Sequence, residues 1–339
     1  MSERRIWMGR EGHFRAEVQA LLGLLAEVDG CSLALRTDPA PGFAWILDPP
    51  QDPAAGEGGF ITLYTSGTTG EPKPVRRNWR EALRQKKGRG GPGDRWLLTY
   101  SPARWAGLSV IAHGLRHGCQ LVVPETLSTE DLARGLARST HVSLTPSLFR
   151  KLLISGFGLE APDLVQVTFG GEAAPQACLD QARRLWPQAR ISHVYASTEL
   201  GDLASTSDGL EGFPHLPGEL AEDGELLVAG TPTGDLWERV GARYLFRGRK
   251  TEIINVGGAK VVPYEVERLI NAQEGVDECR VFGVPSPLVG SLVCAEYRGT
   301  AAPEALARAL RGLLPKYAVP RLTKVEAIAL TDAGKVGRR

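Results

Sequence analysis

The sequence predicts an α/β fold, with a large N-terminal domain of mostly parallel sheets flanked by helices and a smaller α+β domain behind it. Strand-like and helix-like segments alternate over residues 96–195, as they do around parallel sheets. Segments rich in glycine and hydroxyl side chains follow strand-like runs at 65–73, 170–172 and 195–199. Ligands of open α/β sheets bind at the carboxyl ends of strands. The sequence therefore predicts a binding site formed by these three segments.

Length and composition narrow the class of protein. The 339 residues suffice for one large domain and a small one. With 40 basic and 39 acidic residues the formal charge is +1, which predicts neither nucleic-acid binding nor attraction to an anionic membrane. Five dispersed cysteines without metal-binding spacing predict reduced thiols and no zinc site. No apolar run approaches the roughly 18–20 residues of a membrane span, so we expect a cytoplasmic protein.

The N-terminal elements are predicted from local patterns. Residues 13–28 carry apolar side chains at helical spacing and predict an amphipathic helix. Residues 37–59 are rich in Pro, Gly and Asp and predict a loop, whereas 60–64 predict a short strand. A polar helix is expected over 78–87. The arginines and lysines of 76–89 are interpreted as a solvated helix face, with a contact area for phosphate groups as the alternative.

Strands and helices then alternate, and the pattern changes after about residue 217. Predicted strands up to that point are 96–100, 119–123, 141–144, 164–169 and 191–195. Predicted helices are 128–138, 147–154 with Pro146 at its start, and 175–186. Beyond 217 we expect strands 224–228, 234–238, 243–247, 279–284, 291–297 and 324–330, and helices 263–272 and 302–314. A Gly-Arg-Lys junction at 248–250 places the domain boundary so that the domains are 1–247 and 248–339.

The strongest local signal is Thr-Ser-Gly-Thr-Thr-Gly-Glu-Pro-Lys-Pro-Val at 65–75. Glycines allow a tight turn and close approach of a ligand, while backbone N–H groups, hydroxyls and a lysine favour a polyphosphate. The NTPase P-loop needs Lys directly after the second Gly, and here Glu71 and Pro72 intervene. An ordinary surface turn is the alternative. The predicted phosphate-binding residues are Thr65, Ser66, Gly67, Thr68, Thr69, Gly70 and Lys73.

This loop resembles the phosphate loop of the adenylate-forming enzymes, which include acyl-CoA synthetases, aryl-CoA ligases, luciferases and nonribosomal adenylation domains. Further motifs follow in the order of that family. Tyr195-Ala-Ser-Thr198-Glu199 resembles its aromatic-x-x-Thr-Glu motif. The resemblance implies that Tyr195 stacks on the purine, that Thr198 contacts the α-phosphate and that Glu199 binds Mg²⁺. Taken alone, the segment also fits a capped helix N-terminus.

Three other segments are similar to family motifs. Gly170, Gly171 and Glu172 match the turn beside the adenine, although Gly-Gly after a strand is also ordinary loop chemistry. Thr-Gly-Asp at 233–235 and Arg249 match the residues that bind the ribose hydroxyls, an Asx-type turn being the alternative. Residues 252–267, with Gly257 and Gly258, match the loop that lines the pantetheine tunnel.

The end of the chain, Leu-Thr-Asp-Ala-Gly-Lys-Val-Gly-Arg-Arg, resembles the terminal motif with the catalytic lysine, which maps onto Lys335. The alternative is a basic, frayed tail. The resemblance implies a catalytic set of Lys335, Glu199 and Thr198, a mobile C-terminal domain that rotates near residue 250, and the cofactors ATP, Mg²⁺ and CoA or a carrier protein's phosphopantetheine. It implies that a carboxylic acid is first adenylated and then transferred to a thiol.

The chain also departs from the family pattern. Only 64 residues precede the phosphate loop, which predicts a truncated N-terminal part, with a homodimer as one way to replace the lost support. Thr251 stands where the hinge residue is usually Asp or Lys. Transfer to a carrier protein, and a non-catalytic nucleotide-binding role, stay open as alternatives to CoA ligation.

The sequence gives the least information about the carboxylic acid substrate. The segment after Tyr100 has no aspartate to hold an α-ammonium group, which argues against α-amino acids. Arg104 or His113 is a candidate partner for a second carboxylate. Residues 140–146 are similar to o-succinylbenzoate-CoA ligases, which leaves an aryl dicarboxylate open. An aryl or fatty acid is the favoured substrate.

Overall fold

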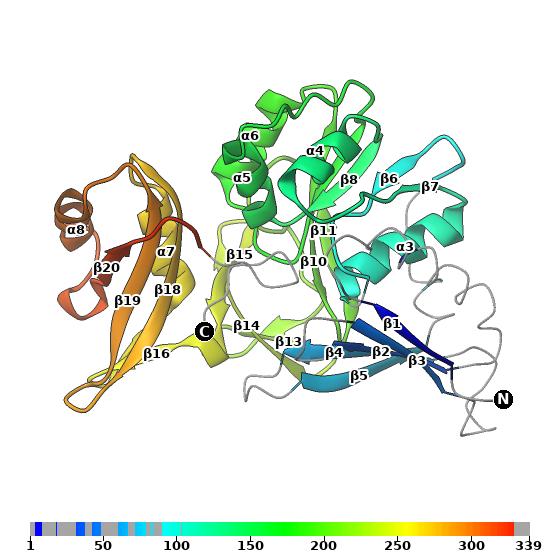
Figure 1. The fold of residues 1–339 in the computed structure, drawn as a ribbon. Coiled ribbons are helices and arrows are strands. Elements are labelled where there is room, and N and C mark those ends of the chain that lie inside the picture. Colours follow the sequence, from blue (N-terminus) through cyan, green and yellow to red (C-terminus); the bar gives the residue numbers. More distant parts are fainter. Residues whose placement is uncertain are drawn as a thin grey trace. The chain divides into compact units, whose positions relative to one another are not determined.

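The computed structural model describes residues 4–8, 18, 32–37, 43–48, 60–66, 72–78, 83, 90–102 and 104–328. The chain divides into two compact units, Met1–Leu210 and Glu211–Arg339, whose elements are drawn in Figure 1. The boundary between residues 247 and 248 expected from the sequence lies inside the second unit and stays a prediction.

A mixed five-stranded sheet contains the earliest strands of the first unit. Its order is β1-β3-β2-β4-β5, with β1 Arg4–Met8, β2 Ser32–Thr37, β3 Phe43–Asp48, β4 Phe60–Ser66 and β5 Pro72–Asn78. Only β2 and β4 pair in parallel, because the connections between β2 and β3 and between β4 and β5 are too short for a crossover. The expectation of mostly parallel sheets is therefore wrong for this sheet.

Two local predictions in this region are corrected. The loop expected over 37–59 contains β3, since the apolar run at 43–47 pairs with strands on both sides. The helix expected from residue 78 cannot begin there because Asn78 is the last residue of β5. Of the amphipathic helix predicted over 13–28, Val18 is described, and it is helical and fully buried.

A six-stranded sheet contains the later strands of the first unit and confirms the predicted α/β alternation. Its order is β11-β10-β9-β8-β6-β7, and all neighbours except β10 and β11 are parallel. The strands are β6 Arg95–Leu97, β7 Gln120–Val122, β8 His141–Leu144, β9 Gln166–Phe169, β10 Arg190–Ser197 and β11 Gly201–Thr206. The helices are α3 Trp105–His117, α4 Thr129–Leu136, α5 Pro146–Ile154 and α6 Gln176–Leu185.

Helices cover both faces of this sheet (Figure 1). Leu97 packs in one core cluster with residues of α4, α5 and α6, whereas its neighbour Trp96 packs against a second cluster that contains α3. Adjacent strand residues face opposite sides of a sheet, so α3 lies on the face away from α4–α6. The second cluster also contains Ile61 and Leu63 of β4. Helix α3 therefore packs between the two sheets of the unit.

The second unit contains two sheets. The first is an antiparallel sheet of order β12-β13-β14-β15, with β12 Glu219–Leu220, β13 Glu225–Val228, β14 Thr231–Val240 and β15 Arg243–Arg249. The second has the order β17-β16-β19-β18 with β20 paired to β19. Its strands are β16 Ile254–Val256, β17 Ala259–Val261, β18 Val276–Ser286, β19 Gly290–Gly299 and β20 Arg321–Lys324.

Over its described residues, up to 328, this unit also contains two helices and two 3₁₀ turns. They are α7 Pro263–Asn271, α8 Pro303–Arg311, η1 Lys250–Glu252 and η2 Lys316–Ala318. Val266 and Ile270 of α7 and Leu306 and Leu310 of α8 share one buried cluster with the sheet. The strand–helix order expected after residue 250 is confirmed, although the last strand ends earlier than predicted.

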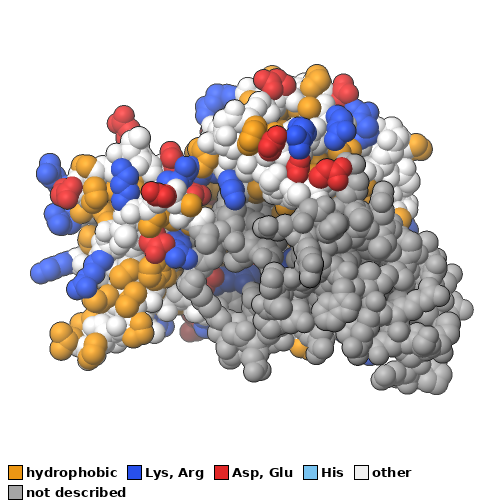
Figure 2. Space-filling view, in the orientation of Figure 1, with side chains coloured by type: hydrophobic (Ala, Val, Ile, Leu, Met, Phe, Trp, Pro, Cys, Tyr) orange, Lys and Arg blue, Asp and Glu red, His pale blue; other side chains and the backbone are white. Residues whose placement is uncertain are grey.

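Surface and composition features agree with the expected charge balance. Figure 2 shows acidic and basic side chains interspersed over the described surface of the face in view. Among the described residues, no helix is long and apolar enough to cross a membrane. The described cysteines Cys119, Cys178, Cys279 and Cys294 are free thiols.

Candidate functional site

Two of the predicted binding segments lie at one edge of the six-stranded sheet. Strands β9 and β10 are parallel neighbours, with Phe169 paired to His193. Gly170 follows the end of β9, and Tyr195 lies near the carboxyl end of β10. The turn at 170–172 and the motif at 195–199 are therefore neighbours at the carboxyl edge, as predicted. The phosphate loop follows β4, which belongs to the other sheet.

The motif at 195–199 forms the end of a strand and the tip of a β-hairpin. Strand β10 runs to Ser197, a turn follows over 198–200, and β11 returns antiparallel. The Ser197 hydroxyl accepts a hydrogen bond from the Leu200 N–H at 3.0 Å and closes the turn. The alternative of a capped helix N-terminus is thus wrong. Glu199 is exposed at the tip, and Thr198 is half-buried.

An arginine of the other sheet contacts this hairpin. Arg77 of β5 donates from Nη1 to the backbone oxygen of Thr198 at 2.9 Å. Its guanidinium carbon also lies 4.4 Å from the centre of the Trp105 ring, within cation–π range. The interpretation of residues 76–89 as a helix face therefore does not hold for Arg77, which is a strand residue that supports the motif.

The Gly-Gly-Glu turn is held against the start of α5. Glu172 Oε2 accepts from the backbone N–H of Ser147 at 3.0 Å. A carboxylate at a helix N-terminus satisfies an otherwise unpaired amide and interacts well with the helix dipole. The Gly170 N–H donates to Leu144 O at 2.9 Å, and Gly171 has φ of 79°. The turn is thus fixed by backbone contacts, with Glu172 facing α5.

Parts of the predicted site lie outside the described residues. Thr65 and Lys73 form a register pair of the β4–β5 ladder, as do Ser66 and Pro72, so the two ends of the phosphate loop are adjacent. The loop residues Gly67, Thr68, Thr69 and Gly70, and the predicted catalytic Lys335, lie outside the described residues.

In the second unit, the two predicted ribose-binding residues are brought together. Asp235 and Arg249 are the terminal register pair of the β14–β15 ladder. Arg249 Nε lies 2.9 Å from Asp235 Oδ1, while the Asp235 side chain is 4% exposed and the Arg249 side chain 51%. A carboxylate beside a guanidinium presents an acceptor and donors together, which suits a vicinal diol. The resemblance to the family motifs predicted that these two residues, 14 positions apart in the sequence, both bind the ribose.

A network of charged side chains surrounds this pair. Glu225 accepts from the Gly234 N–H through Oε1 at 3.0 Å and from Lys250 Nζ through Oε2 at 2.8 Å. Lys250 also pairs with Asp223 Oδ2 at 2.6 Å. The hydrogen bond from Lys250 lowers the pKa of Asp223, and Asp223 followed by Glu225 raises the pKa of Lys250. The Thr233 hydroxyl accepts from the Asp235 N–H at 3.2 Å.

The predicted pantetheine loop is a tight turn between short strands. Gly257 and Gly258 connect β16 to β17, with Val256 paired to Ala259. Their φ values of 56° and 87° are left-handed, and a Cβ at either would meet no described heavy atom within 4 Å. Conformation rather than crowding therefore explains the glycines here.

The two alternative partners of a second carboxylate lie at different places, one just before helix α3 and one within it. Arg104 precedes α3 and His113 lies nine residues further along the chain, roughly 13 Å at a helical rise of 1.5 Å per residue. The His113 ring packs 4.8 Å from Trp96 and 4.5 Å from His117, measured between ring centres. Helix α3 was not among the helices predicted from the sequence.

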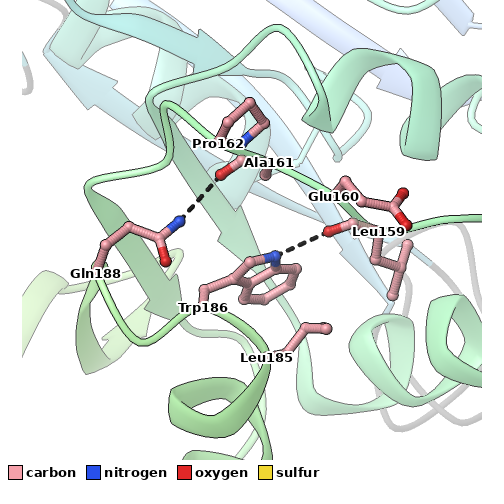
Figure 3. Close-up of a pocket in the computed structure, with 7 residues that line it drawn as sticks. All are labelled: Leu159, Glu160, Ala161, Pro162, Leu185, Trp186 and Gln188. Carbon is pink, nitrogen blue, oxygen red and sulfur yellow. Dashed lines mark hydrogen bonds between the residues drawn. The ribbon is translucent and has the colours of Figure 1, made fainter.

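A surface hollow of about 310 Å³ lies away from these motifs. Trp186 donates to Leu159 O at 2.9 Å and Gln188 to Ala161 O at 3.0 Å across it (Figure 3). Its lining segments precede β9 and β10, so it lies at the amino edge of the sheet. Because ligands of such sheets bind at the carboxyl edge, we do not assign the nucleotide to this hollow.

The described residues fit a nucleotide and a magnesium ion. Asp235 with Arg249 suits a ribose, and Glu199 offers an exposed carboxylate beside the Thr198 hydroxyl. Magnesium is usually held by one or two carboxylates together with phosphate oxygens and water. Over the described part of the chain, no three His, Cys, Asp or Glu side chains form a metal cluster, so a site at Glu199 would depend on the phosphates.

Family models match most of the chain. The model described as AMP-binding enzyme matches residues 16–236, and the model described as AMP-binding enzyme C-terminal domain matches residues 265–335. The first alone covers more than half of the sequence.

Individual relatives are more distant. The chain is 27% identical over 322 residues to the 2-succinylbenzoate–CoA ligase of Listeria monocytogenes, with 81% of this chain and 68% of that protein covered. It is 26% identical over 311 residues to the 3,4-dihydroxybenzoate–[aryl-carrier protein] ligase of Bacillus anthracis, with coverages of 82% and 72%. The chain thus spans about two thirds of the length of these relatives.

A solved structure shows the same fold. The o-succinylbenzoate coenzyme A synthetase (MenE) from Bacillus subtilis, in complex with ATP and magnesium ion, aligns with a TM-score of 0.61 at 20% identity. The alignment covers 81% of this chain and 68% of that chain. At this identity the likeness shows a shared fold and does not by itself assign a substrate.

Proposed function

The chain belongs to the AMP-binding enzyme family, and from this we propose that it is an AMP-forming acid–thiol ligase. A carboxylate oxygen of the acid attacks the α-phosphorus of ATP and pyrophosphate leaves. A thiol sulfur then attacks the acyl carbon, its proton is lost, and AMP leaves. The observation that carries the proposal is the Asp235–Arg249 pair, two residues matched to one role and found 2.9 Å apart.

The proposed nucleotide contacts are those that the family motifs imply. Asp235 and Arg249 bind the ribose hydroxyls, while Tyr195 stacks on the purine beside the turn at 170–172. Thr198 donates to the α-phosphate. Arg77, through its hydrogen bond to Thr198 O, fixes the strand end that carries this hydroxyl.

In this proposal Mg²⁺, Lys73 and Lys335 offset the negative charge of the phosphates and of the substrate carboxylate. When bound, the metal neutralises phosphate oxygens and lowers the repulsion between the two anionic reactants. Glu199 holds it, and the backbone N–H groups of the loop at 65–73 together with Lys73 hold the phosphates. Lys335 bridges the substrate carboxylate and the α-phosphate in the first step.

The proposed acceptor is the thiol of CoA, which reaches the acyl group past the Gly257–Gly258 turn. The relative from Listeria monocytogenes, a CoA ligase by name, supports CoA. The relative from Bacillus anthracis carries the name of an aryl-carrier protein ligase and supports the alternative, transfer to a carrier protein. Both acceptors present the same phosphopantetheine arm, so this turn serves either one.

The proposed acid is an aryl or fatty acid. The names of these two relatives favour the aryl class. An aryl acid with a second carboxylate is a specific variant, for which Arg104 is the better candidate partner because His113 is packed among aromatic rings.

We also propose the domain bounds, the cellular location and the oligomeric state of the protein. The domains are 1–247 and 248–339, and the second moves between the two half-reactions. The protein acts in the cytoplasm, in agreement with its free thiols. The protein forms a homodimer.

The test is ATP–pyrophosphate exchange with pools of aryl, fatty and dicarboxylic acids, followed by AMP release with CoA. We expect exchange that depends on one acid class, and AMP release that depends on CoA. Exchange without CoA-dependent AMP release would favour the carrier protein. Protein that binds ATP but exchanges with no pool would favour a non-catalytic role.

A further inference from the structure

We propose that Glu225 is a positioning residue for ribose recognition, which acts through both members of the Asp235–Arg249 pair without contacting the nucleotide. The inference rests on the proposed function, because it assumes that this pair binds the ribose diol. It assigns a role to a carboxylate that no motif had singled out.

The β14–β15 ladder ends at the Asp235–Arg249 pair. Asp235 and Arg249 are the final register pair of β14 and β15. The next pair would join Gly234 and Lys250, but β15 stops at Arg249 and Lys250 begins the 3₁₀ turn η1. No ladder pair with β14 therefore follows Arg249 on β15, whereas β14 itself continues back to Thr231 and pairs there with β13.

Glu225 takes the place of the missing ladder contact. Its carboxylate lies between the two flanking residues, accepting from the Gly234 N–H at 3.0 Å and from Lys250 Nζ at 2.8 Å. One rigid group therefore restrains the residue before Asp235 and the residue after Arg249. Hydrogen bonds to an ionised acceptor are shorter and stronger than neutral ones, which suits this restraint.

The burial of Glu225 strengthens its contacts with Gly234 and Lys250. The Glu225 side chain is only 11% exposed, whereas the side chains of Lys250 and Asp223 are 47% and 50% exposed. A buried carboxylate loses its hydration and depends on its partners. Removal of Glu225 would leave the Gly234 amide without this acceptor and Lys250 with Asp223 as its remaining carboxylate in this network, so the backbone beside both members of the pair would lose a common anchor.

Gly234 is a position where such an anchor is needed. Its φ of 75° is left-handed, and a Cβ there would meet no described heavy atom within 4 Å. Steric limits on glycine do not hold this backbone in place. The hydrogen bond to Glu225 restrains it, together with the Thr233 hydroxyl, which donates to Leu226 O at 2.9 Å and accepts from the Asp235 N–H at 3.2 Å.

The experiment compares binding of ATP and 2′,3′-dideoxy-ATP by isothermal titration calorimetry in the full chain. The ratio of the two dissociation constants reports only how well the diol is recognised. We expect the wild type to favour ATP by at least about tenfold, the scale of one charge-assisted hydrogen bond. Asp235→Ala should abolish the preference, and Glu225→Ala should reduce it at least about fivefold while dideoxy-ATP binding changes little.

Further variants separate positioning from general damage. Glu225→Gln keeps an acceptor for Gly234 but loses the charge for Lys250, and should retain part of the preference. Glu238→Ala is the matched control, because it removes another carboxylate of β14 that pairs with an arginine of the sheet, Arg247. It should leave the ratio unchanged. In the double variant Asp235→Ala/Glu225→Ala, the second change should cause no further loss of preference.

Two results would overturn the inference, and they differ in meaning. A wild-type preference that persists in Glu225→Ala and Glu225→Gln overturns the role of Glu225 and leaves the proposed function intact. A wild type that binds both nucleotides equally overturns the ribose role of Asp235 and Arg249, and with it both proposals. Should Glu225→Ala fail to fold, Glu225→Gln against Asp235→Ala decides the question.

Discussion

Asp235 is a buried carboxylate that an ion pair stabilises. Its side chain is 4% exposed, and Arg249 is an ion-pair partner. A buried charge without a partner costs several kcal/mol, and the guanidinium offsets part of that cost. Because a carboxylate has about four acceptor positions, Asp235 retains capacity for a diol while it pairs with Arg249.

The first prediction concerns this carboxylate. Asp235→Asn keeps the shape but removes the charge, and we expect the KM for ATP in pyrophosphate exchange to rise by about 10- to 100-fold, as for a lost hydrogen bond to a charged group. The kcat should change much less, since the ribose is remote from the reacting phosphorus. Asp163→Asn, at a side chain that is 63% exposed and precedes β9 at the amino edge of the sheet, serves as control. A large fall in kcat with unchanged KM would contradict the assignment.

The second prediction concerns pH and the pair formed by Asp223 and Lys250. The pKa of Asp223 is lowered, so its stabilisation is present above its unfolded pKa of about 3.9 and is lost as pH falls through its folded pKa. The pKa of Lys250 is raised, so its contribution is present below about 10.4 and is lost as pH rises through the folded value. At pH 7 both contributions are present.

We therefore expect Lys250→Met to lower the melting temperature at pH 7, with a difference from wild type that shrinks near pH 3. Thermal unfolding followed by circular dichroism at the two pH values measures this difference. Lys151→Met, at an exposed position of α5, should show no such pH dependence. An equal difference at both pH values would indicate that Lys250 acts through packing of its alkyl chain.

At the level of elements, a helix or strand was predicted correctly where its own residues form a clear local pattern. Strand β8 and the start of α5 were predicted where they occur, because an apolar run and a proline at the first helical turn define them locally. Helix α3 was missed, since Gly107 and Gly114 lower helix propensity and its stability comes from burial between two sheets. Strand β3 was missed because prolines and glycines near it suggested a loop.

The third prediction concerns the packing of α5. Phe149 is 1% exposed and lies 5.4 Å from the rings of both Phe169 and Trp186, measured between ring centres. Phe149→Ala should cost about 3–5 kcal/mol of unfolding free energy, the usual loss for a buried Phe. Urea unfolding followed by tryptophan fluorescence measures it. Phe157→Ala, at a side chain 42% exposed, should change stability by less than about 0.5 kcal/mol. Equal losses would show that this cluster does not govern stability.

On the scale of the whole molecule, candidate site residues were predictable where a short motif in the sequence contains them. Asp235, Arg249 and the residues of the hairpin at 195–199 were each matched to such a motif. Contacts between distant strands were not predictable: Arg77 donates to a residue 121 positions away, and Glu225 accepts from one 25 positions away. No local pattern encodes such contacts, because they depend on which strands become neighbours.

The fourth prediction concerns the lysine that links the two half-reactions. If Lys335 offsets charge at phosphorus only in the first step, Lys335→Ala should slow acid-dependent pyrophosphate exchange by about 10²–10³-fold, equivalent to roughly 3–4 kcal/mol. ATP binding measured by calorimetry should persist. Thioester formation from a preformed acyl-adenylate should also persist, because one lysine cannot serve both steps in one geometry.

Arg338→Ala is the matched control for that variant, since it removes a positive charge three residues further along the same tail. It should leave exchange within about threefold of wild type if a placed charge, rather than the basic character of the tail, lowers the barrier. Equal losses in the two variants would favour the simpler reading of the tail as a general basic segment. An equal loss of both half-reactions in Lys335→Ala would instead mean that the lysine acts in a step common to both, and that the C-terminal domain does not need to move between them.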